Sequence, residues 1–117
     1  MLAGRVEEIR DVIIDESGST FGKAMFEIEY CIDLLRSVHY EATRAGLDPQ
    51  LVLGLMQVES GFRKYAVSSA GARGYMQVMP FWIKVIGRPD DNLFNLRTNL
   101  RYGCTILRHY LDIEKGD

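Results

Sequence analysis

The stretch LVLGLMQVESGFRKYAVSSAGARGYMQVMP, residues 51–80, carries the features that most constrain the fold. Its first eight residues are apolar or glycine except for Gln57, and a single carboxylate, Glu59, follows them. A segment that is apolar on all sides predicts a helix that runs through the core, not along the surface. A loop rich in Gly, Ser and Ala comes next, and then a second apolar segment that carries Gln77.

Glu59 is the candidate for chemistry in this stretch. At the end of a buried helix its carboxyl would lie near the negative end of the helix dipole and beside apolar neighbours, which both disfavour the ionised form. A carboxylic acid that keeps its proton near neutral pH is what a general acid requires. A lone helix-terminal glutamate is more often simply solvated. The small-residue loop between Gly61 and Gly74 and the amide of Gln77 favour a site, because they allow close approach and hydrogen bonding.

The remaining chain predicts a mostly α protein. Besides residues 50–60, apolar residues recur at helical spacing in four segments, about 6–13, 26–45, 76–86 and from 95 onward. Residues 16–23 and 87–92 have the composition of connecting loops. Asp48 and Pro49 predict a capped helix start, and Gly46 predicts a left-handed end to the helix before it. Strand is expected only as a small local feature in the loop over 68–74.

Size and composition indicate one ordinary globular domain. The chain has 117 residues, of which 47% are hydrophobic and 26% charged. A net charge of −2 argues against a general binder of nucleic acid or anionic membranes. No apolar run reaches the roughly 18 residues that a membrane span needs. Glu7 and Glu8 stand where a signal peptide would need its apolar region, so the sequence predicts no export signal.

The cysteines and histidines do not predict a metal site or a cofactor. Cys31 and Cys104 are too few for a disulfide scaffold; they could be two buried thiols or, in an exported protein, a pair. His39 and His109 do not lie at a zinc-ligand spacing from them.

Three motifs in this order resemble one known family. "ES" closes an apolar helix, "AVSSAGARGYMQVMP" follows about a dozen residues later, and "NLRTNLRYGCTILRHYL" lies on a later helix. From about Ala45 to Asp112 the sequence resembles the lytic transglycosylases with a soluble-transglycosylase (SLT), goose-lysozyme-like catalytic domain. The resemblance implies a lysozyme-like helical domain over 26–117, with an N-terminal helix and linker of unclear role over 1–25.

The resemblance also implies roles for individual residues. Glu59 would be the catalytic acid/base, and Ser60 would position the substrate or the glutamate. A substrate-binding segment along the sugar chain would comprise Gly74, Tyr75, Met76 and Gln77. Tyr75 stands where the family usually has leucine. Asn99 and Gly103 would pack beneath the cleft. The family's Ala-Tyr-Asn element, which supplies a tyrosine to the active site, lies beyond the last helix, so the resemblance predicts a domain that lacks its C-terminal part.

The substrate implied by the resemblance is peptidoglycan, cut at the β-1,4 bond between N-acetylmuramic acid (MurNAc) and N-acetylglucosamine (GlcNAc). One carboxyl would suffice, because the muramic 6-hydroxyl attacks internally and gives a 1,6-anhydro sugar without cofactor. The family implies a periplasmic or cell-envelope location. Two alternatives remain: a goose-type lysozyme in which water attacks, and a non-catalytic peptidoglycan-binding or scaffold module. Oligomeric state is not predicted.

Cationic and aromatic side chains near the proposed cleft could also contact the substrate. The cations Arg63, Lys64 and Arg73 could meet carboxylates of the peptide stems, although solvation is the ordinary fate of such residues. Four aromatic residues at these spacings favour core packing over sugar stacking, with Trp82 the best candidate for a sugar contact: Phe62, Tyr65, Phe81 and Trp82.

Overall fold

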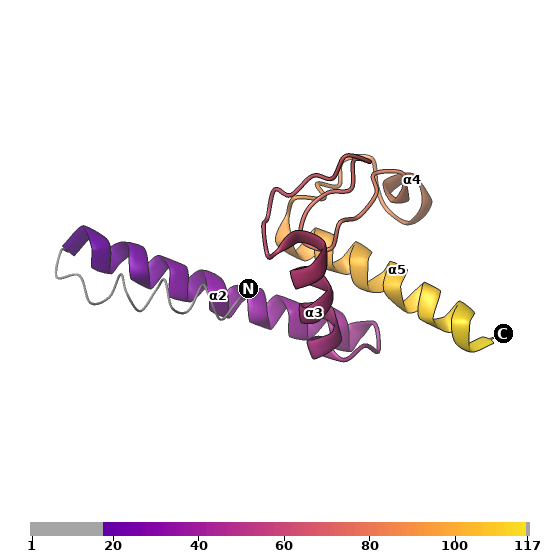
Figure 1. Cartoon of the computed structure of the whole chain (residues 1–117), viewed down its shortest axis with the longest axis horizontal. Coiled ribbons are helices and arrows are strands. Elements are labelled where there is room, and N and C mark those ends of the chain that lie inside the picture. Colours follow the sequence, from indigo (N-terminus) through magenta and orange to yellow (C-terminus); the bar gives the residue numbers. More distant parts are fainter. Residues whose placement is uncertain (1–17, 117) are drawn as a thin grey trace. The chain divides into compact units, whose positions relative to one another are not determined.

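The computed structural model describes residues 18–116, and these are mostly helical (Figure 1). The helices are α2 (Gly18–Arg44), α3 (Pro49–Ser60), α4 (Trp82–Ile86) and α5 (Leu96–Gly116). Among the described residues extended pairing is limited to two isolated bridges, Val67 with Arg73 and Arg73 with Val78. The mostly α prediction is confirmed. Of the three bridged residues, Arg73 lies within the predicted range 68–74, and Val67 and Val78 lie outside it. The predicted helix over 6–13 lies outside the described residues.

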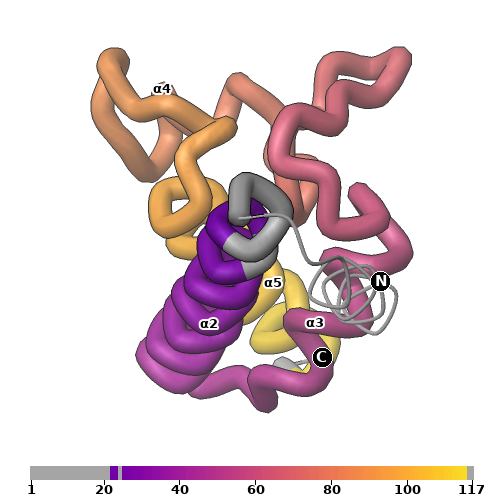
Figure 2. Tube along the Cα trace, turned by 90° about the vertical axis from the view of Figure 1, so that its left-hand side faces the viewer, coloured from indigo at the N-terminus to yellow at the C-terminus, as the bar shows by residue number. Residues whose placement is uncertain are grey.

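The chain divides into two units, residues 1–36 and 37–117, and α2 passes from the first into the second. The second unit holds the last turns of α2, then α3, the long loop, α4 and α5. Figure 2 shows the irregular path of the chain between α3 and α4. Everything that concerns the candidate site lies in this second unit. The proposed boundary at residue 25 stays a prediction.

The local signals around the start of α3 are confirmed. The Asp48 side chain accepts a hydrogen bond from the Gln50 backbone N–H at 2.9 Å, and Pro49 occupies the first turn. Gly46 has a φ of 73°, and the Leu47 N–H donates to the Ala42 carbonyl at 2.8 Å. A left-handed glycine thus ends α2, and a capped turn starts α3 directly afterwards.

Three predictions about helix extent and burial are wrong. Residues 18–23 belong to α2 instead of a loop, because glycine, serine and threonine disfavour a helix by only about 1 kcal/mol or less each. The predicted helix over 76–86 shortens to α4, because Gln77 has a positive φ of 53° and Pro80 cannot donate.

The third wrong prediction is the burial of α3, which is not enclosed on all sides. Its buried residues are Val52, Met56 and Ser60, whereas Leu51 is 47% and Val58 is 81% exposed. An apolar composition makes burial of a helix favourable, but it does not determine which faces of the helix other parts of the chain cover. The helix therefore has an exposed side, and Glu59 lies in its exposed part.

The second unit has a core drawn from α2, α3, α5 and the long loop. Its most buried large side chains include Val38, Val52, Met56, Tyr75, Leu93 and Leu100. Glu41 on α2 is only 3% exposed, and Arg101 on α5 donates to both of its carboxylate oxygens at 3.1 Å. This two-bonded pair fixes the last turns of α2 against α5 with a defined geometry.

Candidate active site

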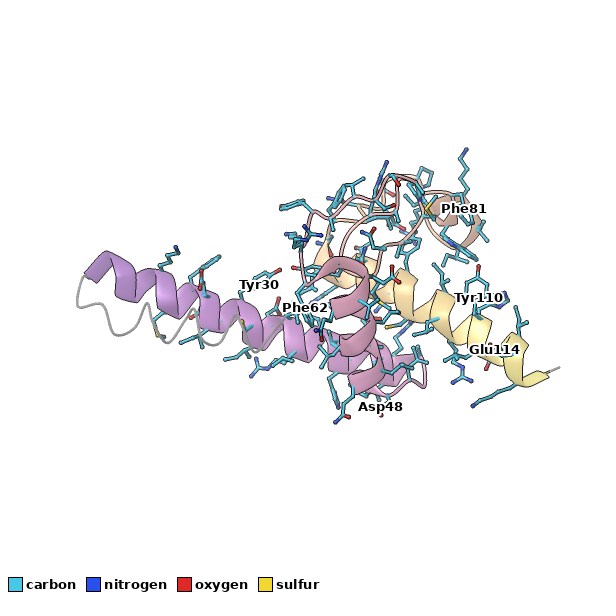
Figure 3. All side chains as sticks on the ribbon, viewed as in Figure 1. Tyr30, Asp48, Phe62, Phe81, Tyr110 and Glu114 are labelled. Atoms are coloured by element: carbon cyan, nitrogen blue, oxygen red, sulfur yellow. The ribbon has the colours of Figure 1, made fainter. Side chains whose placement is uncertain are left out.

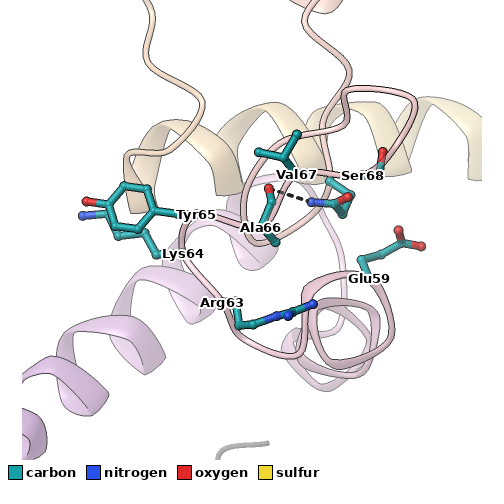
Figure 4. A pocket seen from close by; sticks show the side chains of 8 residues that line it. Glu59, Arg63, Lys64, Tyr65, Ala66, Val67 and Ser68 are labelled. Carbon is teal, nitrogen blue, oxygen red and sulfur yellow. Dashed lines mark hydrogen bonds between the residues drawn. The ribbon is translucent and has the colours of Figure 1, made fainter.

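The C-terminal end of α3 turns back sharply. Gly61 has a φ of 58° and its N–H donates to the Gln57 carbonyl at 3.1 Å. Phe62, the next residue, also has a positive φ, of 61°, and it lies at the end of α3 (Figure 3). Two consecutive left-handed residues, one of which carries a side chain, cost of the order of 1–3 kcal/mol. They bring residues 63–68 round to the side of the helix where Glu59 lies (Figure 4).

The turn borders an open pocket of about 740 Å³. It is lined by Glu59, Arg63, Lys64, Tyr65, Ala66, Val67, Ser68 and Gln77. Glu59 is the acidic residue of this lining, and Figure 4 shows it at the helix end beside the loop that carries Ser68. Its side chain is exposed, so the prediction that Glu59 lies at the end of a buried helix, among apolar neighbours, is wrong. The pocket itself is present around the predicted carboxyl.

Gln77 is held by its amide nitrogen. Its Nε2 donates to the Ala66 carbonyl at 3.1 Å and to the Gly74 carbonyl at 3.0 Å. Both amide hydrogens are thereby used, so the carbonyl Oε1 is the group that can accept a hydrogen bond from a ligand. Among the described residues, Phe62 and Gln77 are the non-glycine residues with positive φ, and both lie at this site. Backbone strain of this kind clusters at functional sites.

Ser60, Gly74, Tyr75 and Met76 lie behind the pocket and not in its lining. The Ser60 hydroxyl is buried and donates to the Met56 carbonyl at 3.0 Å, and its own carbonyl accepts from Arg63 Nε at 2.9 Å. Ser60 thus ties the last turn of α3 to the start of the loop. A contact of these four residues with substrate stays a prediction.

Asn99 on α5 holds the loop from below. Its Oδ1 accepts from the Met76 N–H at 2.8 Å, and its Nδ2 donates to the carbonyls of Arg73 at 2.9 Å and Leu93 at 2.8 Å. The side chain is fully buried. One amide therefore joins three chain segments, and its three bonds satisfy backbone groups that would otherwise be buried without partners. Asn99 lies beneath the cleft segment, as the sequence predicted.

Two glycines allow this close packing. A Cβ on Gly103 would lie 2.3 Å from Met76 Sδ and 2.7 Å from Met76 Cβ. A Cβ on Gly74 would lie 2.5 Å from Asn99 Nδ2 and 2.7 Å from the Leu93 carbonyl, and the φ of Gly74 is 75°. Asn99 and Gly103 are four residues apart and so share one face of α5. We call Gly74, Met76, Leu93, Asn99 and Gly103 the cleft floor.

Two tyrosines behind the site differ in their hydroxyl environments. Tyr75 is fully buried, and its hydroxyl has no hydrogen-bond partner among the described residues. The Tyr102 hydroxyl instead donates to Asp91 Oδ2. Burial of Tyr102 and its bond to Asp91 raise the pKa of this phenol to about 12. The bond from Tyr102, with one from the Arg88 N–H, lowers the pKa of the Asp91 carboxyl.

Two lining residues, Ser68 and Tyr65, were not predicted from the sequence to belong to the site. Ser68 was treated only as part of a loop of small residues; its Oγ accepts from the Ala72 N–H at 3.1 Å, which leaves the hydroxyl proton able to donate. Tyr65 is 70% exposed at the pocket, so its predicted core packing is wrong. The same correction applies to Phe81, which is 53% exposed (Figure 3). A signal for Tyr65 was its place directly after the turn that follows Glu59.

Trp82 does not line the pocket. It is half-buried at the start of α4, with its ring 5.0 Å from that of Phe81 and 6.3 Å from that of Tyr110. Its predicted sugar contact therefore finds no support in the position of the pocket. The aromatic residue of the pocket lining is Tyr65, whose ring centre lies 5.8 Å from that of Phe94.

The described residues contain no group of three or more side chains that could hold a metal ion. None of their helices has both the length and the apolar character needed to cross a membrane. Cys31 and Cys104 are both free thiols. Burial raises the pKa of the Cys104 thiol to about 12, so this cysteine is an unreactive part of the core.

Comparison with known proteins gives a consistent result. Residues 36–117 match the family model described as "Transglycosylase SLT domain". The chain is 44% identical over 84 residues to "Membrane-bound lytic murein transglycosylase C" of Histophilus somni, covering 61% of this chain and 23% of that protein. The protein of that name from Glaesserella parasuis is 43% identical over 88 residues, covering 64% and 24%. That from Actinobacillus pleuropneumoniae is 59% identical over 39 residues, covering 33% and 11%.

These alignments thus span about a quarter or less of the length of the relatives. The family match includes α3, the whole pocket and the cleft floor, and it covers more than half of the chain. The chain therefore belongs to the transglycosylase SLT domain family.

Proposed function

We propose that the chain is a peptidoglycan lytic transglycosylase domain that cleaves the MurNAc-β-1,4-GlcNAc bond and forms 1,6-anhydroMurNAc. The observation that carries the proposal is the position of Glu59, which closes α3 and is the acidic residue among the eight that line the pocket. The names of the relatives, which act on murein, support the same substrate class.

Glycosidases with two carboxylates place them on both sides of the scissile bond. Two other acidic residues of the second unit have structural partners: Asp48 caps α3, and Asp91 accepts from Tyr102 and from the Arg88 N–H. A mechanism with one protein carboxyl fits this arrangement best. It needs a second group from the substrate to stabilise the positive charge that develops on the sugar.

The proposed reaction begins with proton transfer from Glu59 to the glycosidic oxygen. The bond to the anomeric carbon breaks, and the N-acetyl group of the muramic residue stabilises the charge on that carbon. The Glu59 carboxylate then takes the proton of the muramic 6-hydroxyl, whose oxygen bonds to the anomeric carbon. Glu59 is protonated again, and no water is consumed. Acid–base catalysis of this type contributes about 10²–10⁴-fold.

The other predicted site residues have supporting roles in the proposal. Gln77 Oε1 accepts a hydrogen bond from the sugar, since its Nε2 is already committed to Ala66 and Gly74. Ser60 keeps the last turn of α3, and with it Glu59, in position through its bond to Met56. Gly74, Tyr75 and Met76 form the segment along which the glycan lies, and Gly74 and Met76 also belong to the cleft floor. The place of action is the cell envelope, in the periplasm.

Mass spectrometry of the fragments released from purified peptidoglycan tests this proposal. We expect 1,6-anhydro ends, about 18 Da lighter than the hydrolysis products because one water is not added. Reducing ends would contradict it and indicate a goose-type lysozyme. Binding to peptidoglycan without any released fragment would indicate a non-catalytic module.

A further inference from the structure

The pocket differs in charge from the rest of the chain. The chain as a whole has a net charge of −2, but the pocket lining holds two cations, Arg63 and Lys64, and one carboxylate, Glu59. Concave surfaces concentrate the field of their charges, so a local positive excess in a pocket attracts anions more strongly than the same charges on an open surface. The proposed acid–base chemistry at Glu59 uses neither cation.

Arg63 is held in place while most of its donors stay available. Its Nε donates to the Ser60 carbonyl at 2.9 Å, which anchors the guanidinium to the end of α3. Within residues 18–116, neither terminal nitrogen of Arg63 is recorded in a hydrogen bond, and no carboxylate pairs with it. An anchored guanidinium with free terminal nitrogens is suited to bind a carboxylate with two parallel hydrogen bonds, because less side-chain freedom is lost on binding.

Lys64 adds a second positive charge to the same wall. Its Nζ lies 5.4 Å from the centre of the Tyr65 ring, and both residues line the pocket. The cation–π contact holds the ammonium near an exposed aromatic ring instead of letting it extend into solvent. Like Arg63, Lys64 forms no ion pair with any of the described residues. Two restrained cations without carboxylate partners thus face one pocket.

The chemistry of the substrate supplies such a partner. In peptidoglycan each muramic residue carries a lactyl ether, which is joined to a peptide stem that bears carboxylates. If the stem is removed, the lactyl group itself ends in a carboxylate. A polymer of GlcNAc alone, as in chitin, has neither group. The anion is therefore attached to the muramic sugar, whose glycosidic bond the proposed reaction cleaves.

We propose that Arg63 and Lys64 bind a carboxylate carried by the muramyl substituent and so make the site select muramyl glycan over uncharged GlcNAc polymers. This inference rests on the proposed function for the identity of the glycan. The two residues determine specificity and take no part in proton transfer. The ligand chemistry is a carboxylate, which comes either from the peptide stem or from the lactyl group.

The test is equilibrium binding by the Glu59→Gln protein, which leaves the glycan uncut. Three ligands of matched glycan length are compared: strands with peptide stems, strands stripped of their stems by an amidase, and chitin oligosaccharides. The double variant Arg63→Gln/Lys64→Gln is made in the same background. Lys84→Gln/Lys115→Gln is the matched control, because it removes the same charge from two exposed lysines outside the pocket.

We expect at least one muramyl ligand to bind about tenfold or more tightly than chitin at low salt, as charge-assisted contacts would provide. The Arg63/Lys64 double variant should lose most of this preference and keep its affinity for chitin, whereas the control should keep both. The preference should also weaken as salt is raised. If stripped and peptide-bearing strands bind equally, the bound carboxylate is that of the lactyl group. If stripped strands bind only as weakly as chitin, the bound carboxylate is that of the peptide stem.

The inference is overturned if the Glu59→Gln protein binds all three ligands equally or binds none. It is also overturned if the double variant loses affinity for all three in parallel, since that would indicate a general role in folding or glycan contact. Failure of the proposed function looks different. Wild-type protein that releases no anhydro fragments but retains the charge-dependent preference contradicts the reaction and supports this inference.

Discussion

The pocket wall and the cleft floor are built on different principles. The wall, which comprises Glu59 and residues 63–68, consists largely of exposed or half-buried side chains with few partners in the protein. The floor is buried, its polar groups are paired, and its glycines leave no space for an added carbon. The region that matches the family model thus contains both an accessible wall and a tightly packed floor. Substitutions in the two regions should fail in different ways.

The largest expected effect is on activity and comes from the wall. Glu59→Gln should lower the rate of fragment release from peptidoglycan by about 10²–10⁴-fold, because the amide cannot donate and recover the proton. Its melting temperature should stay close to that of wild type, since the side chain is exposed. Glu114→Gln, an exposed glutamate on α5, is the control and should keep full activity (Figure 3). Retained activity in Glu59→Gln would refute the catalytic assignment.

The next largest effect is on stability and comes from the floor. Gly74→Ala should lower the free energy of unfolding by about 3 kcal/mol, because the new Cβ meets Asn99 and the Leu93 carbonyl and the positive φ disfavours alanine. Chemical denaturation measures the change. Gly54→Ala is the matched control: Gly54 lies in α3 with nothing within 4 Å of the added carbon, so we expect a gain of about 0.5–1 kcal/mol. Equal effects at both positions would show that the floor is less tightly packed than described.

A smaller effect, of opposite sign, is expected at Tyr75. Tyr75→Phe removes a buried hydroxyl that has no partner among the described residues, so the free energy of unfolding should rise by about 1 kcal/mol. Urea denaturation of the two proteins at pH 7 measures it. A clear loss of stability would mean that the hydroxyl is satisfied, for example by an ordered water. Reduced cleavage at unchanged stability would instead support the predicted substrate contact of Tyr75.

The smallest effect concerns Tyr102 and depends on pH. Tyr102→Phe removes the bond to Asp91, so wild type should be the more stable protein near neutral pH. The pKa of Asp91 is lowered in the folded chain, so its contribution is present above the unfolded value near 4 and is lost as pH falls through the lower folded value. The pKa of Tyr102 is raised to about 12, so its contribution is full below pH 10 and is lost between about 10 and 12.

Melting temperatures of wild type and Tyr102→Phe across pH 3–11 check this prediction. The difference between them should form a plateau at intermediate pH and shrink at both ends. A difference that does not change with pH would mean that Tyr102 acts through packing alone. Tyr75→Phe is the control here, since its hydroxyl has no carboxylate partner.

Features set by neighbouring residues were predictable from the sequence. Asp48 and Pro49 act within one turn of α3, so the cap could be predicted from chemistry alone. The segment that holds Gln77 could not: its periodicity favours a helix, but Arg73 and Val78 pair through two backbone hydrogen bonds, and Asn99, 23 residues from Met76, binds the Met76 N–H. The prediction that α3 is buried on all sides was wrong for a related reason, because the elements that cover a helix face are distant from it in sequence. Glu59 and Gln77 were predicted to share a site, and both line the pocket.

The bonds of Asn99 have a consequence for how the molecule opens. Because one buried side chain binds the backbone at residues 73, 76 and 93, the segment over residues 73–77 cannot detach from α5 without breaking two of these bonds at once. The cleft floor and α5 should then open together, as a single cooperative unit. In hydrogen-exchange measurements the Met76 amide hydrogen should therefore exchange as slowly as those in the middle of α5. The wall can vary in sequence while that unit persists unchanged.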